Sequence, residues 1–199
     1  MKAKLLVALV ISLLATTVPV SAGAAMLAYS ATLSGAAEVP PNASPGIGSA
    51  YVTIDLDNNT MRVQASFSGL LGNTTASHIH CCTATGYAGT AGVATQTPSF
   101  VGFPLGVTSG TYDHTFDMTL ASSYRTAFVT ASGGTTAGAL AALIAGLDAG
   151  EAYFNIHTTL LPGGEIRGFL APVPLPAAAW LLLSGLAGLG VLGRRRTAA

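Results

Sequence analysis

Charge is scarce in this chain, and it is unevenly placed. Charged residues make up 8% of the 199 residues, and five of the eight bases lie at the two ends. The body between the ends therefore has 3 arginines against 8 acids, and 3 − 8 gives a net charge of −5. An acidic body without a basic stripe repels phosphate backbones, which argues against nucleic acid as a partner. Low charge with 24 glycines favours an extracellular all-β domain over a helical enzyme, which would carry more Glu and Lys.

Cysteine is almost absent, since the only two are the neighbours Cys81 and Cys82. Their position excludes an ordinary disulfide between distant segments. The pair can form a strained eight-membered disulfide ring, remain as free thiols, or supply soft metal ligands. The disulfide and the free thiols rank above metal ligation. The sequence also shows no Ser-His-Asp set and no carboxylate pair, and this argues against an enzyme.

The N-terminus has the pattern of an export signal. Residues 1–4 are a positively charged start, and residues 5–15 are an apolar run. Small residues suitable for cleavage follow at residues 20–24. The alternative is an N-terminal membrane anchor, but the apolar run is short and Thr16, Thr17 and Pro19 interrupt it. We therefore predict a signal peptide over residues 1–25 and export across the inner membrane.

Residues 27–171 predict a single all-β domain. Apolar and polar residues alternate over 52–56 and 61–67, and the turn residues Asp57–Asn59 lie between them, which predicts a hairpin. Short strand signals of this kind, without alternating helices, indicate an antiparallel β-sandwich or barrel. One helix is expected over Thr136–Leu147. The long loop from Thr83 to Gly110 is typical of a functional loop or a lid.

Histidine is also rare, and three of the four histidines suggest a metal site. His78 and His80 flank Ile79, so on a strand both imidazoles project from one face. His157 belongs to a second strand with a polar face, and imidazole nitrogens bind copper or zinc well. If a metal binds, one nitrogen of each ring should lie within about 3–4 Å of the others. Cys81 and Cys82 are the weaker candidate ligands. The alternative is a polar strand face that hydrogen-bonds a neighbouring loop.

Near the end of the body, Asn155, His157 and Arg167 form a polar group in a region otherwise poor in charge. Glu165 and Arg167 are two residues apart on the last strand, so their side chains should lie on the same face. The simplest interpretation of these two is an ion pair that fixes the strand to its neighbour.

The C-terminal segment, residues 172–199, predicts a second targeting signal. Residues 173–177 read VPLPA, an apolar span follows over 177–193, and three arginines occupy 194–196. The span is near the lower limit for a transmembrane helix, and the arginines indicate its cytoplasmic end. This order resembles the VPLPA variant of the PEP-CTERM sorting signal. The resemblance implies processing by an exosortase and delivery to the surface of a Gram-negative bacterium. A plain single-pass membrane anchor is the alternative.

Four motifs in order resemble the CHRD domain, which is repeated in chordin and found singly in exported bacterial proteins. The motifs are LSGAAEVPP at 33–41, HIH at 78–80, NIHT at 155–158 and GEIRG at 164–168. The resemblance covers about Tyr29 to Leu170. It implies an immunoglobulin-like β-barrel, distantly similar to copper-zinc superoxide dismutase, and no settled activity. Cys81 and Cys82 depart from the general pattern.

Two classes of function follow. The first is a non-catalytic extracellular or matrix-associated binding or structural module. The second is a copper-binding or superoxide-dismutase-like redox protein that uses His78, His80 and His157. A full dinuclear site needs about seven ligands, so four histidines would support a single copper at most. Binding of a protein ligand, by analogy with chordin, is a third possibility.

Overall fold

The computed structural model describes residues 26–173. The predicted signal peptide, and all but the first two residues of the predicted sorting signal, lie outside this range. Within residues 26–173, no helix is both long and apolar enough to cross a membrane.

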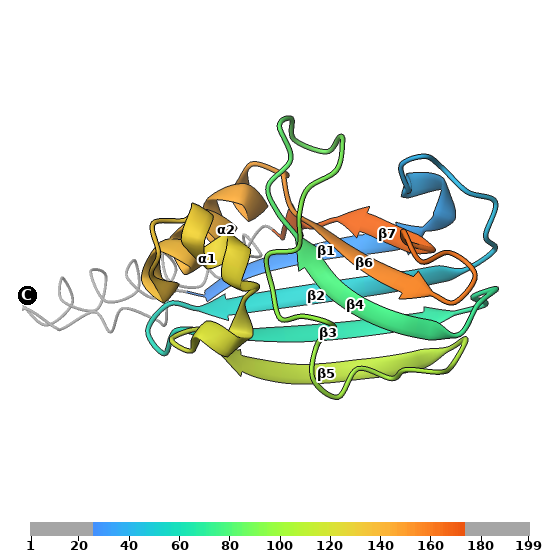
Figure 1. Cartoon of the computed structure of the whole chain (residues 1–199), viewed down its shortest axis with the longest axis horizontal. Helices are drawn as coiled ribbons and strands as arrows, with labels where there is room; N and C mark the ends of the chain where they lie inside the picture. Colours follow the sequence, from blue (N-terminus) through green and yellow to red (C-terminus); the bar gives the residue numbers. More distant parts are fainter. Residues whose placement is uncertain (1–25, 174–199) are drawn as a thin grey trace, which may run out of the picture.

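Eight strands of the described part form one antiparallel sheet in the order β4-β6-β7-β1-β2-β3-β5, with β8 paired to β1. Figure 1 shows β4, β6 and β7 lying across β1, β2, β3 and β5, so the sheet folds over on itself as a half-barrel or sandwich. The predicted all-β fold is confirmed. The strands are β1 (Met26–Ser34), β2 (Ile47–Asp55), β3 (Thr60–Ser68), β4 (Thr74–His80), β5 (Gly110–Asp117), β6 (Tyr153–Thr158), β7 (Ile166–Phe169) and β8 (Ala171–Pro172).

Two α-helices lie between β5 and β6 and sit at one end of the sheet (Figure 1). The predicted helix is confirmed as α2 (Thr136–Asp148), and the side chain of Thr135 caps it by accepting from the amide of Gly138. The shorter helix α1 (Thr126–Ala131) was not predicted. Six residues are too few to display a helical period, and this sequence is rich in residues that also suit strands. Single 3-10 turns occupy Gly35–Ala37 and Ala121–Ser123.

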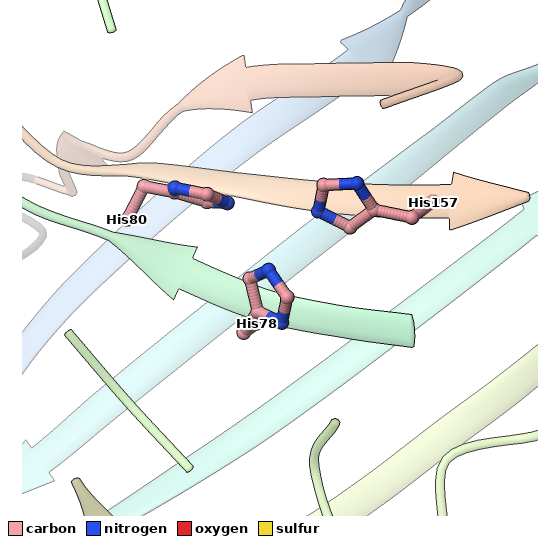
Figure 2. A group of neighbouring side chains, drawn as sticks. All are labelled: His78, His80 and His157. Carbon is pink, nitrogen blue, oxygen red and sulfur yellow. The ribbon is translucent and has the colours of Figure 1, made fainter. Parts of the chain in front are cut away.

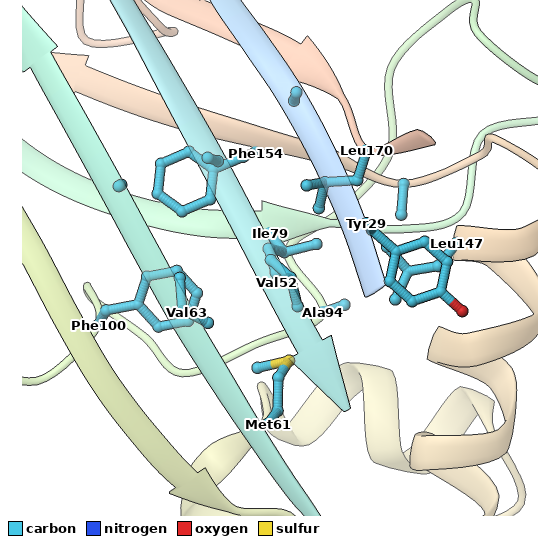
Figure 3. Packing of buried hydrophobic residues seen from close by; sticks show 14 of the residues in the cluster. Tyr29, Val52, Met61, Val63, Ile79, Ala94, Phe100, Leu147, Phe154 and Leu170 are labelled. Carbon is cyan, nitrogen blue, oxygen red and sulfur yellow. The ribbon is translucent and has the colours of Figure 1, made fainter. Parts of the chain in front are cut away.

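The core lies between the two halves of the folded sheet. Along β1, the buried Tyr29, Ala31 and Leu33 alternate with exposed residues, as the strand period of two requires. The predicted hairpin is confirmed as β2 and β3, in which Val52 faces Val63. Figure 3 shows Tyr29, Val52 and Val63 packed with residues of β4, β6 and α2. Burial of this apolar surface is the main favourable contribution to folding.

The long loop between β4 and β5 covers the open edge of β4. The amides of Ala94 and Phe100 donate to the carbonyls of Ile79 and Ser77, at 2.9 and 3.0 Å. Phe100 is also buried in the core. The loop therefore satisfies the free backbone groups of an edge strand, which protects that edge from pairing with other chains.

Candidate metal centre

Three histidines meet on the outer face of β4 and β6. His78 and His80 alternate with the buried Ile79 on β4, and β6 pairs with β4 so that His78 faces Asn155 and Ala76 faces His157. His157 is therefore a diagonal neighbour of His78 on the same face. The ring centroids of His78 lie 4.8 Å from His80 and 4.7 Å from His157.

One ring nitrogen of each histidine lies within 4.8 Å of the other two. Figure 2 shows a nitrogen of each ring turned toward the space between the three rings. The separation is wider than the 3–4 Å predicted for a metal-bound set. The predicted meeting of the three side chains nevertheless appears in the folded chain.

Backbone carbonyls fix the orientation of two of the rings. Nδ1 of His80 lies 2.8 Å from the carbonyl oxygen of Ala91, and Nδ1 of His157 lies 2.9 Å from that of Pro162. Because a carbonyl can only accept, each Nδ1 carries the proton and each Nε2 keeps its lone pair. Both Nε2 atoms are buried and have no hydrogen-bond partner in the described part of the chain. Metal-binding histidines are typically held in this way by their second nitrogen.

The surroundings keep the cluster uncharged. Burial, with the neighbouring His157 and His80, lowers the pKa of His78 to about 3. Burial also lowers the pKa of His80 to about 4 and lowers the pKa of His157. The imidazoles are thus neutral at neutral pH, which is the form that binds metal ions.

Two residues that the sequence did not single out as site residues support the cluster. Tyr153 stacks on His80, and the guanidinium of Arg167 lies 4.5 Å from the centre of the Tyr153 ring. Glu38 pairs with Arg167 at 3.8 Å, and burial raises the pKa of Glu38 to about 7. Tyr153 could have been found from the sequence, because it lies on the same strand face as His157. Glu38 could have been found because it lies inside a family motif.

The other candidates lie elsewhere. Cys81 and Cys82 form a disulfide. Cys81 is buried in the core, on the side of the chain opposite to His80. The fourth histidine, His114, lies on β5 against Phe116. The structure therefore brings His78, His80 and His157 together without the two cysteines.

The fold and the site together define the class of this protein: an all-β domain with a cluster of three neutral histidines on one face. The chain belongs to the CHRD domain family, whose model matches residues 29–170. Searches of curated proteins and of solved structures found no match.

Proposed function

We propose that this CHRD domain is an exported module that binds one transition-metal ion, copper or zinc, through His78, His80 and His157. The observation that carries the proposal is the placement of one nitrogen of each ring within 4.8 Å of the others. Three imidazoles suit both ions, and copper binds such ligands more tightly than zinc.

The energetics of the site also support a bound ion. A buried nitrogen lone pair without a partner costs about 1–3 kcal/mol, and Nε2 of both His80 and His157 is in this condition. An ion about 2 Å from each nitrogen would satisfy them after small rotations of the rings. With three protein ligands, a fourth position stays open for water or a small ligand.

A single ion is the more economical proposal. In residues 26–173, His78, His80 and His157 form the only group of three or more potential ligands close enough to hold a metal. A dismutase-like pair of metals would need a second such group. The module would therefore bind, buffer or cycle one ion.

The decisive experiment is metal analysis of the purified full-length protein after loading with copper or zinc. Wild type should retain about one ion per chain, because three neutral imidazoles converge. His80→Ala/His157→Ala should retain far less. His114→Ala is the matched control, because it removes the histidine outside the cluster, and it should bind like wild type. Equal metal content in all three proteins would refute the proposal.

A second candidate function is a surface or matrix module that works without a metal. The N-terminal export pattern and the VPLPA segment favour delivery to the cell surface after exosortase processing, with the membrane as a transient partner. Mass spectrometry of surface protein should then find a C-terminus near Pro172–Ala177. Recovery of chains that retain Arg194–Arg196 would instead support a membrane anchor. Surface delivery without metal retention would favour this second function.

A further inference from the structure

The disulfide between Cys81 and Cys82 follows directly after His80, the residue at which β4 ends. Its two halves are unequally placed, since Cys81 is 5% exposed and Cys82 is fully on the surface. Thiol–disulfide exchange begins when a thiolate attacks a disulfide sulfur, so it requires access to that sulfur. An external thiol therefore reaches Cys82 far more readily than Cys81.

Helix α2 packs directly against both sulfur atoms. Gly146 is buried there, and a Cβ on it would overlap the sulfurs of both Cys81 and Cys82. One turn earlier, the carbonyl oxygen of Ala142 lies 3.8 Å from Sγ of Cys82. Two thiols need more room than two bonded sulfurs, because a bond holds its atoms well inside their van der Waals contact distance. Since the helix backbone occupies that room, reduction must shift α2 or the end of β4.

The end of β4 also positions a candidate metal ligand. The amide of Cys81 donates to the carbonyl of Gly92 at 3.0 Å, and the carbonyl of the preceding residue, Ala91, lies 2.8 Å from Nδ1 of His80. His80 also forms an isolated β-bridge with Val93. The short segment that orients the imidazole of His80 is therefore fixed to the cysteine pair.

We propose that Cys81–Cys82 is a thiol–disulfide exchange site, and that its reduction weakens metal binding by releasing His80 from the carbonyl that orients it. The reductant is a dithiol. One of its thiolates attacks Sγ of Cys82, and the electron pair of the broken bond goes to Sγ of Cys81, which takes up a proton. The second thiol of the reductant then displaces Cys82 as a thiol. The reductant leaves as a disulfide, and two electrons and two protons have reached the protein.

The point of attack is tested with two variants of the full-length protein. Cys81→Ser keeps the exposed thiol, and Cys82→Ser keeps the buried one. A chromogenic disulfide reagent should react at least about tenfold faster with the first, because exchange requires access. In wild type quenched with acid during reaction with glutathione, mass spectrometry should find glutathione on Cys82. Glutathione on Cys81, or equal rates in two variants that melt alike, would overturn this assignment.

The release of His80 is tested in the metal-free full-length protein, before and after reduction with dithiothreitol. NMR should show that the Nδ1 proton of His80 exchanges with solvent at least about tenfold faster after reduction. His157 is the internal control, because the carbonyl of Pro162 holds its Nδ1, and its exchange should not change. Unchanged exchange at His80 would overturn the proposal. Equal acceleration at both rings would also overturn it, because it would show a general loosening of the domain.

The effect on the metal rests on the proposed function, and chelator competition for zinc tests it after the reductant has been removed. Zinc is used because it has no redox chemistry and does not reoxidise the thiols. Reduced wild type should bind zinc about tenfold more weakly than oxidised wild type, and reoxidation should restore the affinity. Cys81→Ser/Cys82→Ser lacks both the bond and the thiols, so it should bind like the reduced protein.

The outcomes separate this proposal from the metal function itself. Equal or tighter zinc binding after reduction, with clear binding before it, would overturn the regulation alone. Absence of zinc binding by oxidised wild type would refute the metal function and its regulation together. The exchange at Cys82 and the release of His80 would then stand or fall with the mass spectrometry and the NMR.

Discussion

The imidazole of His80 lies parallel to the phenol ring of Tyr153, with the ring centroids 4.7 Å apart and the planes at 4°. The same tyrosine also contacts Ala91, the residue whose carbonyl bonds the imidazole. Its hydroxyl accepts from the amide of Ala91 at 3.2 Å, and the carbonyl of Ala91 lies 2.8 Å from Nδ1 of His80. Tyr153 therefore holds His80 both by stacking and by positioning its hydrogen-bond partner.

The first prediction separates these two effects. Tyr153→Phe keeps the stacking and loses the hydroxyl, so copper affinity should fall by a few-fold. Tyr153→Leu loses both and should cost about 10- to 100-fold, as is usual for partners that orient metal ligands. Competition with a chromogenic chelator measures the affinity. Tyr112→Phe is the control, because its hydroxyl donates to the carbonyl of Val101 and not to a residue of the cluster. Unchanged binding by Tyr153→Leu would contradict the prediction.

The second prediction concerns pH and Glu38. Burial raises the pKa of Glu38 to about 7 from its ordinary value of 4.5, despite Arg167 at 3.8 Å. The folded state thus binds a proton that the unfolded state releases between these values. The resulting stability is fully present below pH 4.5 and is lost as pH rises through about 7, by about 3 kcal/mol in all.

Urea unfolding of wild type and Glu38→Gln, from pH 5 to 8, measures this contribution. The histidines titrate in both proteins, so the difference in unfolding free energy isolates Glu38. Relative to the variant, wild type should lose stability as pH rises. A difference that does not change with pH would show that Glu38 keeps an ordinary pKa.

The third prediction concerns Gly146, where α2 passes the disulfide. A Cβ added there would overlap the sulfur atoms of both Cys81 and Cys82. Alanine is favoured over glycine in a helix by about 1 kcal/mol, but overpacking costs about 1–3 kcal/mol. Gly146→Ala should therefore destabilise the domain in urea unfolding. Ala145→Gly, at an exposed position of the same helix, measures the difference in helix propensity between Ala and Gly without any overpacking. A more stable Gly146→Ala would show that the helix moves freely away from the disulfide.

The fourth prediction concerns Glu165, which is fully buried and joins three segments. Its carboxylate accepts from the hydroxyls of Ser44 and Thr158, at 2.6 and 2.7 Å, and from the amides of Leu71 and Gly72. These hydrogen bonds lower its pKa against the opposing effect of burial. Its contribution to stability is therefore present above the unfolded pKa and is lost in acid.

Glu165→Gln replaces an acceptor oxygen by a donor and leaves some of these groups unpaired. The loss should be about 2–4 kcal/mol in chemical unfolding at pH 7. Glu151→Gln, at a partly exposed acid, is the control and should change stability by less than about 0.5 kcal/mol. Equal stability of the two variants would show that water replaces the lost bonds.

Much of the fold could be predicted, because the strands of this chain alternate cleanly. The β2–β3 hairpin is defined by Val52 and Val63 facing inward around a polar turn, so its pattern is local. The pattern of helix α1 is also local, but the helix is too short to show the helical repeat of apolar residues. The pairing of β4 with β6 could not be predicted, because the two strands are distant in sequence and only packing sets their register.

The histidine cluster was partly predictable for the same reason. Parity placed His78 and His80 on one face, while the position of His157 beside them depended on the β4–β6 register. The same rule could have separated Cys81 from His80, since adjacent strand residues face opposite ways. The ion pair expected of Glu165 and Arg167 is wrong, because Arg167 pairs with Glu38 and Glu165 accepts four hydrogen bonds from other groups.

The first and last strands of the domain are neighbours, since β8 pairs with β1 and the amide of Val173 donates to the carbonyl of Ala28 at 2.8 Å. Both ends of the domain thus leave the sheet at one place. A peptide linker of a few residues could join them, so the domain should tolerate circular permutation with new ends at an exposed turn such as Asp57–Asn59. Because its two ends are neighbours, the domain should also be suitable for insertion into a surface loop of another protein.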